Sequence, residues 1–134
     1  MDRESTLNIY HGIFHALFAN RQVSVYTLDR AYRDVFKDSP KISISETLEN
    51  SDIALITDER TLNDVLYTMN GNTDYSKKPM LMVTNYKFVK VSDKIVAAFY
   101  WRKGRSQLLF IKKRLEQYDT ILPEEYQKFM IDEL

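Results

Sequence analysis

The chain has 134 residues, of which 44% are hydrophobic and 28% charged, and its formal net charge is zero. That length fits one domain with a sizeable core, and the balanced charge favours neither a nucleic-acid partner nor a membrane surface. The absence of cysteine excludes disulfides, thiol catalysis and cysteine metal sites. The longest apolar run, Ile95 to Trp101, is too short for a membrane-spanning helix. Because the polar opening residues do not form a signal peptide, we expect a cytoplasmic protein, or a periplasmic one whose signal has been removed.

The first half of the sequence alternates between helical and strand patterns. Apolar residues at helical spacing predict an opening helix over residues 5–19, with Ser5 and Thr6 as candidate N-caps. Asp29 is placed to cap a short helix, and the near-continuous apolar run 52–57 is typical of a strand buried on both faces. The expected elements up to Asn72 are a helix at 5–19, a strand at 22–28, a helix at 30–37, strands at 41–45 and 52–57, and a helix through Leu62 and Met69 that ends at Asn70–Asn72.

The second half combines one more buried strand with a hairpin and further helices. The expected elements are a linker at 73–78, a strand at 80–84, an ambiguous segment at 85–94 with at most one helical turn, hairpin strands at 94–102 and 105–111, a helix at 112–118, and a last helix that Pro123 opens and that runs through Leu134. Because doubly apolar strands alternate with helices, we predict an α/β fold. We expect a single domain over residues 1–134, with a mostly parallel sheet covered by helices on both faces and a late antiparallel β-hairpin.

The hairpin is the clearest local feature of the sequence. Lys103-Gly104 suits a two-residue turn, which places Arg102 opposite Arg105 and the preceding residues in register. One face then carries Trp101, Phe99, Ala97, Leu108 and Phe110, and the other carries Tyr100, Ala98, Val96, Leu109 and Ile111. Both faces are apolar, so we expect helices or a second subunit to cover them. Phe99 and Trp101 are therefore predicted to be core or interface residues, with Trp101 mostly buried.

Charge is unevenly distributed along the chain. The segment from Lys77 to Arg114 contains eleven Lys or Arg and one acidic residue, Asp93, while both flanks are acidic. One interpretation is a basic face for an anionic partner, such as an acidic protein, phospholipid head groups or nucleic acid. The candidate contact residues for such a partner are Arg102, Lys103, Arg105, Lys112 and Lys113. The alternative is that the acidic flanks neutralise these charges in the folded chain.

Two other constellations suggest sites. His11 and His15 stand four apart on the first helix, but Gly12 replaces the glutamate of an H-E-x-x-H zinc motif, so we expect surface histidines and no metal site. Asp58, Thr84 and Lys103 follow successive strands, an order similar to that of response-regulator receiver domains. Receivers begin with a strand that ends in paired acids, however, and this chain begins with a helix. No phosphate-binding loop or nucleophile elbow is visible, and no cofactor is expected.

The order and hydropathy of the elements resemble the YfiR-like family of bacterial periplasmic proteins. The segments that carry the resemblance are Ile9–Phe14, Val23–Tyr26, Asn50–Thr57, Pro79–Thr84, the hairpin, and Leu115–Met130. The chain departs from the family in having no cysteine and no export signal. The resemblance implies a periplasmic, dimeric regulator without catalytic activity that binds a protein partner such as a membrane-anchored signalling protein. It assigns no partner-binding residue in this sequence.

Three functional hypotheses follow. The first is a non-enzymatic regulatory or interaction domain that binds a protein partner and forms a homodimer. The second is a receiver-like or small-ligand-binding signalling domain. The third, a nucleic-acid-binding domain with a basic face, is the one that we favour least, because the basic residues lie on several elements that need not share a face.

Overall fold

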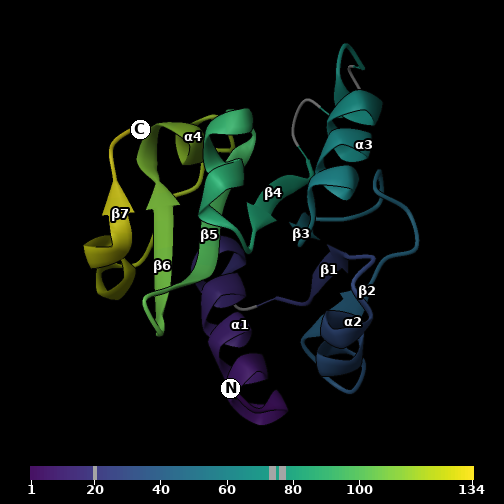
Figure 1. The fold of residues 1–134 in the computed structure, drawn as a ribbon, viewed down its shortest axis with the longest axis vertical. Helices are drawn as coiled ribbons and strands as arrows, with labels where there is room; N and C mark the ends of the chain where they lie inside the picture. The colour runs from purple at the N-terminus through teal and green to yellow at the C-terminus, as the bar shows by residue number, and fades with distance from the viewer. Residues whose placement is uncertain (20, 73–74, 76–77) are drawn as a thin grey trace.

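The computed structural model describes residues 1–19, 21–72, 75 and 78–134. These residues form a seven-stranded sheet in the order β2-β1-β3-β4-β5-β6-β7, which runs from right to left in Figure 1. All neighbouring strands are parallel except the antiparallel pair β5–β6. The strands are β1 (Val23–Tyr26), β2 (Ile42–Ile44), β3 (Ile53–Ile56), β4 (Met80–Val83), β5 (Ile95–Arg102), β6 (Arg105–Ile111) and β7 (Met130–Ile131). The predicted α/β fold, with its mostly parallel sheet and late hairpin, is confirmed.

Helices cover both faces of this sheet, as predicted. On one face, α1 (Arg3–Phe18), α2 (Arg30–Phe36) and the 3-10 helix η3 (Glu124–Phe129) enclose a core that is rich in aromatic rings. Tyr10 lies at its centre, with ring centroids 5.5 Å from Phe36 and 5.8 Å from Phe99. On the other face, α3 (Glu59–Met69) and the 3-10 helix η2 (Tyr86–Val91) cover a smaller aliphatic core. The strands β3 and β4 are buried on both faces, which explains their continuous apolar sequences.

Aspartate side chains cap the N-termini of the three longest helices. Asp29 and Asp58 accept hydrogen bonds from backbone N–H groups at the starts of α2 and α3, and the prediction for Asp29 is confirmed. The cap of α1 is Asp2, whose carboxylate accepts the N–H of Ser5. The prediction of Ser5 and Thr6 as caps is therefore wrong. With Asp2 as the cap the helix begins at Arg3, and the N–H of Ser5 is one of the first-turn donors that need a partner outside the helix.

The C-terminal segment differs from the prediction. The expected helix from Pro123 to Leu134 is instead η3 followed by β7, which pairs in parallel with the end of β6. In a 3-10 helix, residues three apart lie on one side. Tyr126 and Phe129 use that spacing to pack together, and Tyr126 meets Phe110 edge to face with ring centroids 6.1 Å apart. Ending the helix early also lets β7 pair with the outer edge of β6 at Phe110.

The hairpin register agrees with the prediction from Arg102 opposite Arg105 to Phe99 opposite Leu108, and the pairing continues to Ala97 opposite Phe110. Lys103 and Gly104 both have positive φ, 52° and 77°, as a type I′ turn requires. One face assignment is wrong. The register between β4 and β5 shifts after Ile95, and this β-bulge turns Val96 toward the same core as Ala97.

The remaining elements are close to expectation. The helix α4 (Lys112–Glu116) is shorter than the predicted 112–118, and η2 fills the segment left ambiguous at 85–94. Of the predicted linker 73–78, residues 73, 74, 76 and 77 lie outside the described part of the chain. Within the described residues, no helix is long and apolar enough to cross a membrane.

Candidate functional site

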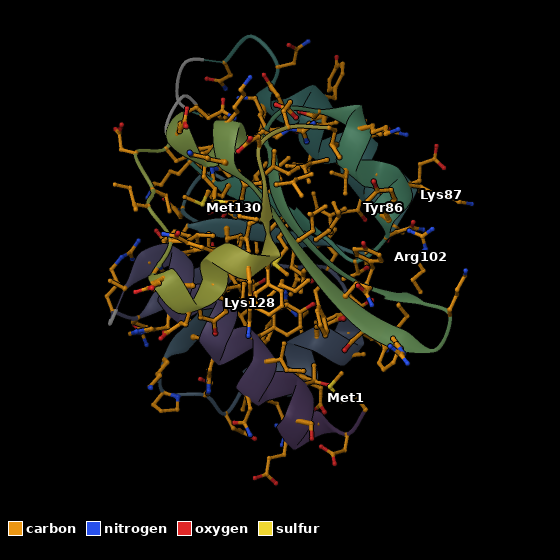
Figure 2. The ribbon with its side chains drawn as sticks, turned by 90° about the vertical axis from the view of Figure 1, so that its left-hand side faces the viewer. Met1, Tyr86, Lys87, Arg102, Lys128 and Met130 are labelled. Atoms are coloured by element: carbon orange, nitrogen blue, oxygen red, sulfur yellow. The ribbon has the colours of Figure 1, made fainter. Side chains whose placement is uncertain are left out.

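The outer half of the hairpin, Tyr100–Gln107, extends beyond the rest of the sheet. Val83 ends β4 level with Ala98, so the following residues of β5 have no neighbour on that side. Burial falls accordingly: Phe99 is 8% exposed and belongs to the core, whereas Trp101 is 57% exposed. Figure 2 shows this outer hairpin projecting from the body. The expectation that Trp101 is mostly buried is wrong for the single chain, because β5 extends beyond the end of the neighbouring strand β4.

The outer hairpin carries different chemistry on its two faces. Arg102 and Arg105 are directly opposed, so their side chains share a face with Tyr100. On that face Tyr86 of η2 lies against Tyr100, with ring centroids 5.2 Å apart. Two tyrosines and two arginines therefore share this face.

Trp101 occupies the opposite face, above the aromatic core. It lines a groove of about 400 Å³ together with Phe99, Tyr32 of α2, and Met1 and Arg3 at the start of the chain. An exposed tryptophan beside such a groove is typical of a contact residue for a partner.

The cations of the outer hairpin have no partners in the described part of the chain. The side chains of Arg102, Lys103 and Arg105 form no ion pair and no hydrogen bond with any described residue. The like-charged pair Arg102–Arg105 is destabilising in isolation, because the two guanidinium groups repel each other across the strands. An anion bound at this end would relieve that repulsion.

Lys112 and Lys113 lie at the opposite end of β6 from these arginines. The strand has seven residues, and at about 3.3 Å per residue its ends are roughly 20 Å apart. The N–H of Lys113 bonds to the carbonyl of Asp132, so acidic residues of the C-terminal segment lie nearby. The structure therefore divides the five predicted contact residues between two ends of the hairpin. The sequence could not show this, because the turn at Lys103 reverses the chain.

A third basic residue, Arg114, is structural. It is 7% exposed, and its Nη1 donates to the carbonyl oxygens of Val89, Ser92 and Ile95 at 2.6, 2.9 and 3.0 Å. Its Nε lies 3.4 Å from a carboxylate oxygen of Glu133, without hydrogen-bond geometry. The side chain anchors η2 and the start of β5, so it contributes nothing to a basic face.

The outer edge of β6 adds backbone groups that the sequence did not indicate. Because Arg102 and Arg105 close a two-residue turn, the N–H and C=O groups of Ser106 and Leu108 face away from β5. β7 pairs only with Phe110 and Ile111. In the described part of the chain, nothing bonds to the outward groups of Ser106 and Leu108. Two donors and two acceptors are therefore open to an added strand.

The strand order β2-β1-β3-β4-β5 places the carboxyl ends of β1 and β3 at a topological switch point, where α/β folds commonly bind ligands. Here Asp29 caps α2 and also accepts a 3.0 Å hydrogen bond from Thr57. Asp58 caps α3, and hydrogen bonds from Thr61 hold the pKa of its carboxyl below the ordinary value. Both carboxylates at the switch point are thus engaged in local structure.

The structure does not bring Lys103 to this switch point. Ala98 is level with the end of β4, and Lys103 lies five residues further along the hairpin. At about 3.3 Å per residue, Lys103 is roughly 16 Å from the end of β4. Asp58, Thr84 and Lys103, whose order along the chain is similar to that of receiver domains, therefore do not form one cluster.

The two histidines lie on α1, with Nε2 of His11 2.7 Å from Oγ of Ser39. No group of three metal-ligating side chains is present in the described ranges. The histidines line a pocket with Arg21 and Lys41, two residues that no sequence pattern connects with them. No periodicity links these positions, because β1 and α2 lie between the histidines and Lys41.

No protein-family model, curated protein sequence or solved structure matches this chain. The resemblance to the YfiR-like family therefore stays a prediction.

Proposed function

We propose that this chain is a non-enzymatic interaction domain that binds an acidic, extended segment of a protein partner at the outer hairpin. The observation that carries the proposal is the outer hairpin itself, which projects past its sheet with an exposed Trp101 on one face and, on the other, two arginines without partners among the described residues. Apolar side chains of core strands are normally covered. An exposed tryptophan next to arginines matches the composition of protein-binding hot spots.

The open edge of β6 suggests how the partner segment lies. A strand added there would bond to the outward groups of Ser106 and Leu108 and place alternate side chains on the two faces. On one face, acidic side chains would meet Arg102 and Arg105. On the other, apolar side chains would reach the groove of about 400 Å³ that Leu108 lines with residues of α1 and η3. The expected partner segment therefore alternates acidic and apolar residues.

The same surface is less suited to nucleic acid. Its two tyrosines pack on each other, with ring centroids 5.2 Å apart, and so offer few free faces for base stacking. The chain also has no net positive charge. The family resemblance extends the proposal to a periplasmic regulator whose partner is a membrane-anchored signalling protein.

Fluorescence tests this proposal directly, because Trp101 is the single tryptophan of the chain. A short peptide of alternating Glu and Val should change the Trp101 emission saturably, and a Lys–Val peptide of equal length should not. Raising the salt from about 0.05 M to about 0.5 M should weaken binding several-fold, because the Debye length shortens. An equal response to both peptides, or tighter binding of a single-stranded oligonucleotide, would overturn the proposal.

The chain offers a matched control for the charge argument. Arg102→Gln with Arg105→Gln should weaken Glu–Val binding about tenfold or more, because two unit charges leave the contact surface. Lys112→Gln with Lys113→Gln removes the same charge at the far end of β6 and should leave affinity within about twofold. Ser106→Pro removes an outward N–H and should weaken binding without unfolding the chain. Unchanged binding in that variant would refute strand addition while leaving the charge contact standing.

A receiver-like or small-ligand function is the second candidate, and the strand order favours it. Under this alternative, beryllofluoride would perturb backbone amide signals around Asp58. The capping bonds that Asp58 already accepts from Thr61 argue against it. We expect no perturbation at Asp58 or at the neighbouring Thr57.

A further inference from the structure

A basic pocket of about 250 Å³ lies at the amino ends of β1 and β2, beneath the C-terminal half of α1. Four of its lining residues carry nitrogen-containing basic side chains: His11, His15, Arg21 and Lys41. None of the described residues that line it is acidic. The switch point at the carboxyl ends of the strands lies at the opposite edge of the sheet, and the outer hairpin is formed by other elements. The basic pocket is therefore separate from both the switch point and the outer hairpin.

The basic side chains converge from three parts of the chain. His11 and His15 come from α1, Arg21 from the connection to β1, and Lys41 from the residue before β2. Asp52 is the acid paired with this group, since its carboxylate lies 3.1 Å from Nη1 of Arg21. The Lys41 side chain has no partner within the described residues. The pocket therefore keeps a positive potential after its one ion pair is counted.

His11 is partly buried where it lines this pocket. Burial, together with the ammonium group of Lys41, lowers the pKa of the His11 imidazole below its ordinary value. An anion in the pocket would reverse this effect, because it would stabilise the protonated ring. The Ser39 hydroxyl, 2.7 Å from Nε2 of His11, adds a polar group to the pocket wall.

The rest of the lining is apolar. Phe14, Val23 and Ile42 are each less than 5% exposed and form one wall of the pocket. Most of each side chain is packed in the core, and only its edge stays open to the pocket. Around a bare inorganic ion that edge would remain in contact with water, whereas a carbon skeleton of a few atoms would cover it, and burying apolar surface stabilises a complex.

We propose that the basic pocket binds a small organic anion, with its phosphate or carboxylate group against His11, His15, Arg21 and Lys41 and its carbon skeleton against Phe14, Val23 and Ile42. A pocket of about 250 Å³ holds a compound of roughly this size and no nucleotide. The carboxylate of Asp52 keeps Arg21 in place through its 3.1 Å contact, so the guanidinium faces an arriving anion without reorganisation.

Nuclear magnetic resonance gives a specific readout, because His11 and His15 are the two histidines of the whole chain and both line the pocket. Their imidazole signals are titrated with inorganic phosphate, butyl phosphate, butyrate and butylammonium. Butyl phosphate should shift both signals saturably below about 10 mM, more tightly than phosphate alone, and should raise the pKa of His11. Butyrate against butyl phosphate separates a carboxylate ligand from a phosphate ligand.

Lys41→Met and Lys90→Met form a matched pair, since both remove one exposed lysine and only Lys41 lines the pocket. Lys41→Met should weaken butyl phosphate binding about tenfold, and Lys90→Met should leave it unchanged. Thermal unfolding of both variants checks that the fold is retained. Three results would overturn the proposal: no saturable shift of the histidine signals with butyl phosphate or butyrate, an equal shift with butylammonium, or equal affinities of the two variants for butyl phosphate.

Discussion

Replacing Arg114 with methionine is expected to destabilise the protein strongly, although Arg114 belongs to the basic segment that the sequence suggests for binding. The side chain is 7% exposed and its Nη1 supplies hydrogen bonds to three backbone carbonyls. Methionine has a similar length and fills much of the same volume, so the substitution mainly removes the donor and the charge.

The magnitude follows from the groups that are left behind. The carbonyl oxygens of Val89, Ser92 and Ile95 would lose a charged donor, and buried acceptors without a donor each cost about 1–3 kcal/mol. Losing the buried charge of Arg114 offsets part of this sum, because a buried guanidinium is itself poorly solvated. We expect a net loss of about 3–5 kcal/mol of unfolding free energy. At about 2.1 cal/mol/K of unfolding entropy per residue, Tm should fall by roughly 10–18 °C for this 134-residue chain.

Thermal and urea unfolding followed by circular dichroism measure this loss. Lys113→Met is the control, because Lys113 is the preceding residue of α4 and is exposed, and it should change stability by less than about 0.5 kcal/mol. If Arg114→Met lost less than about 1 kcal/mol, or no more than the control, the structural role of Arg114 would be wrong. Its charge would then have to be counted with the binding residues.

Three further predictions test other parts of the structure. Phe99→Ala should lose about 3–5 kcal/mol of unfolding free energy, whereas Trp101→Ala, at an exposed position, should lose roughly 1–2 kcal/mol; equal losses in urea unfolding would contradict the assignment of Trp101 to the surface. Gly12→Ala should fail to stabilise α1, because the new Cβ would collide with the hydroxyl of Tyr126. In a Tyr126→Phe background, where the nearest ring carbon lies 3.7 Å away, the same substitution should raise the unfolding free energy by about 0.5–1 kcal/mol, and an equal change in both backgrounds would disprove this contact. Burial raises the pKa of Tyr118 from 10.0 to about 12. The unfolded chain therefore loses this proton first, and the unfolding free energy should fall as pH rises across that interval. Tyr118→Phe should reduce this fall, and an unchanged pH profile would argue against burial of the phenol.

Local patterns predicted the parts of the fold that depend on neighbouring residues. The continuous apolar run at Ile53–Ile56 identifies a strand buried on both faces. The register of the hairpin follows from the turn at Lys103-Gly104, because a two-residue loop fixes every pair that follows it.

The features that sequence patterns missed depend on contacts between distant segments. β7 forms at Met130–Ile131 because the end of β6 offers unpaired backbone groups there, and nothing in the local sequence reveals that edge. Trp101 is exposed because β5 extends beyond β4, a difference in strand length that becomes visible only when the two strands are paired. The basic pocket likewise unites Lys41 with α1 across a sequence separation that no periodicity spans.

The β-bulge at Val96 means that the faces of the outer hairpin depend on the exact number of residues in β5. Side chains alternate along a strand, so the one extra residue in the register decides that Phe99 and Trp101 face α1 while Tyr100 and Arg102 face η2. Inserting one residue between Ala97 and Phe99 would exchange these two sets and turn the arginine toward the aromatic core. Inserting two residues would only lengthen the projection. Among related sequences, we therefore expect hairpins of different length to differ by even numbers of residues in each strand.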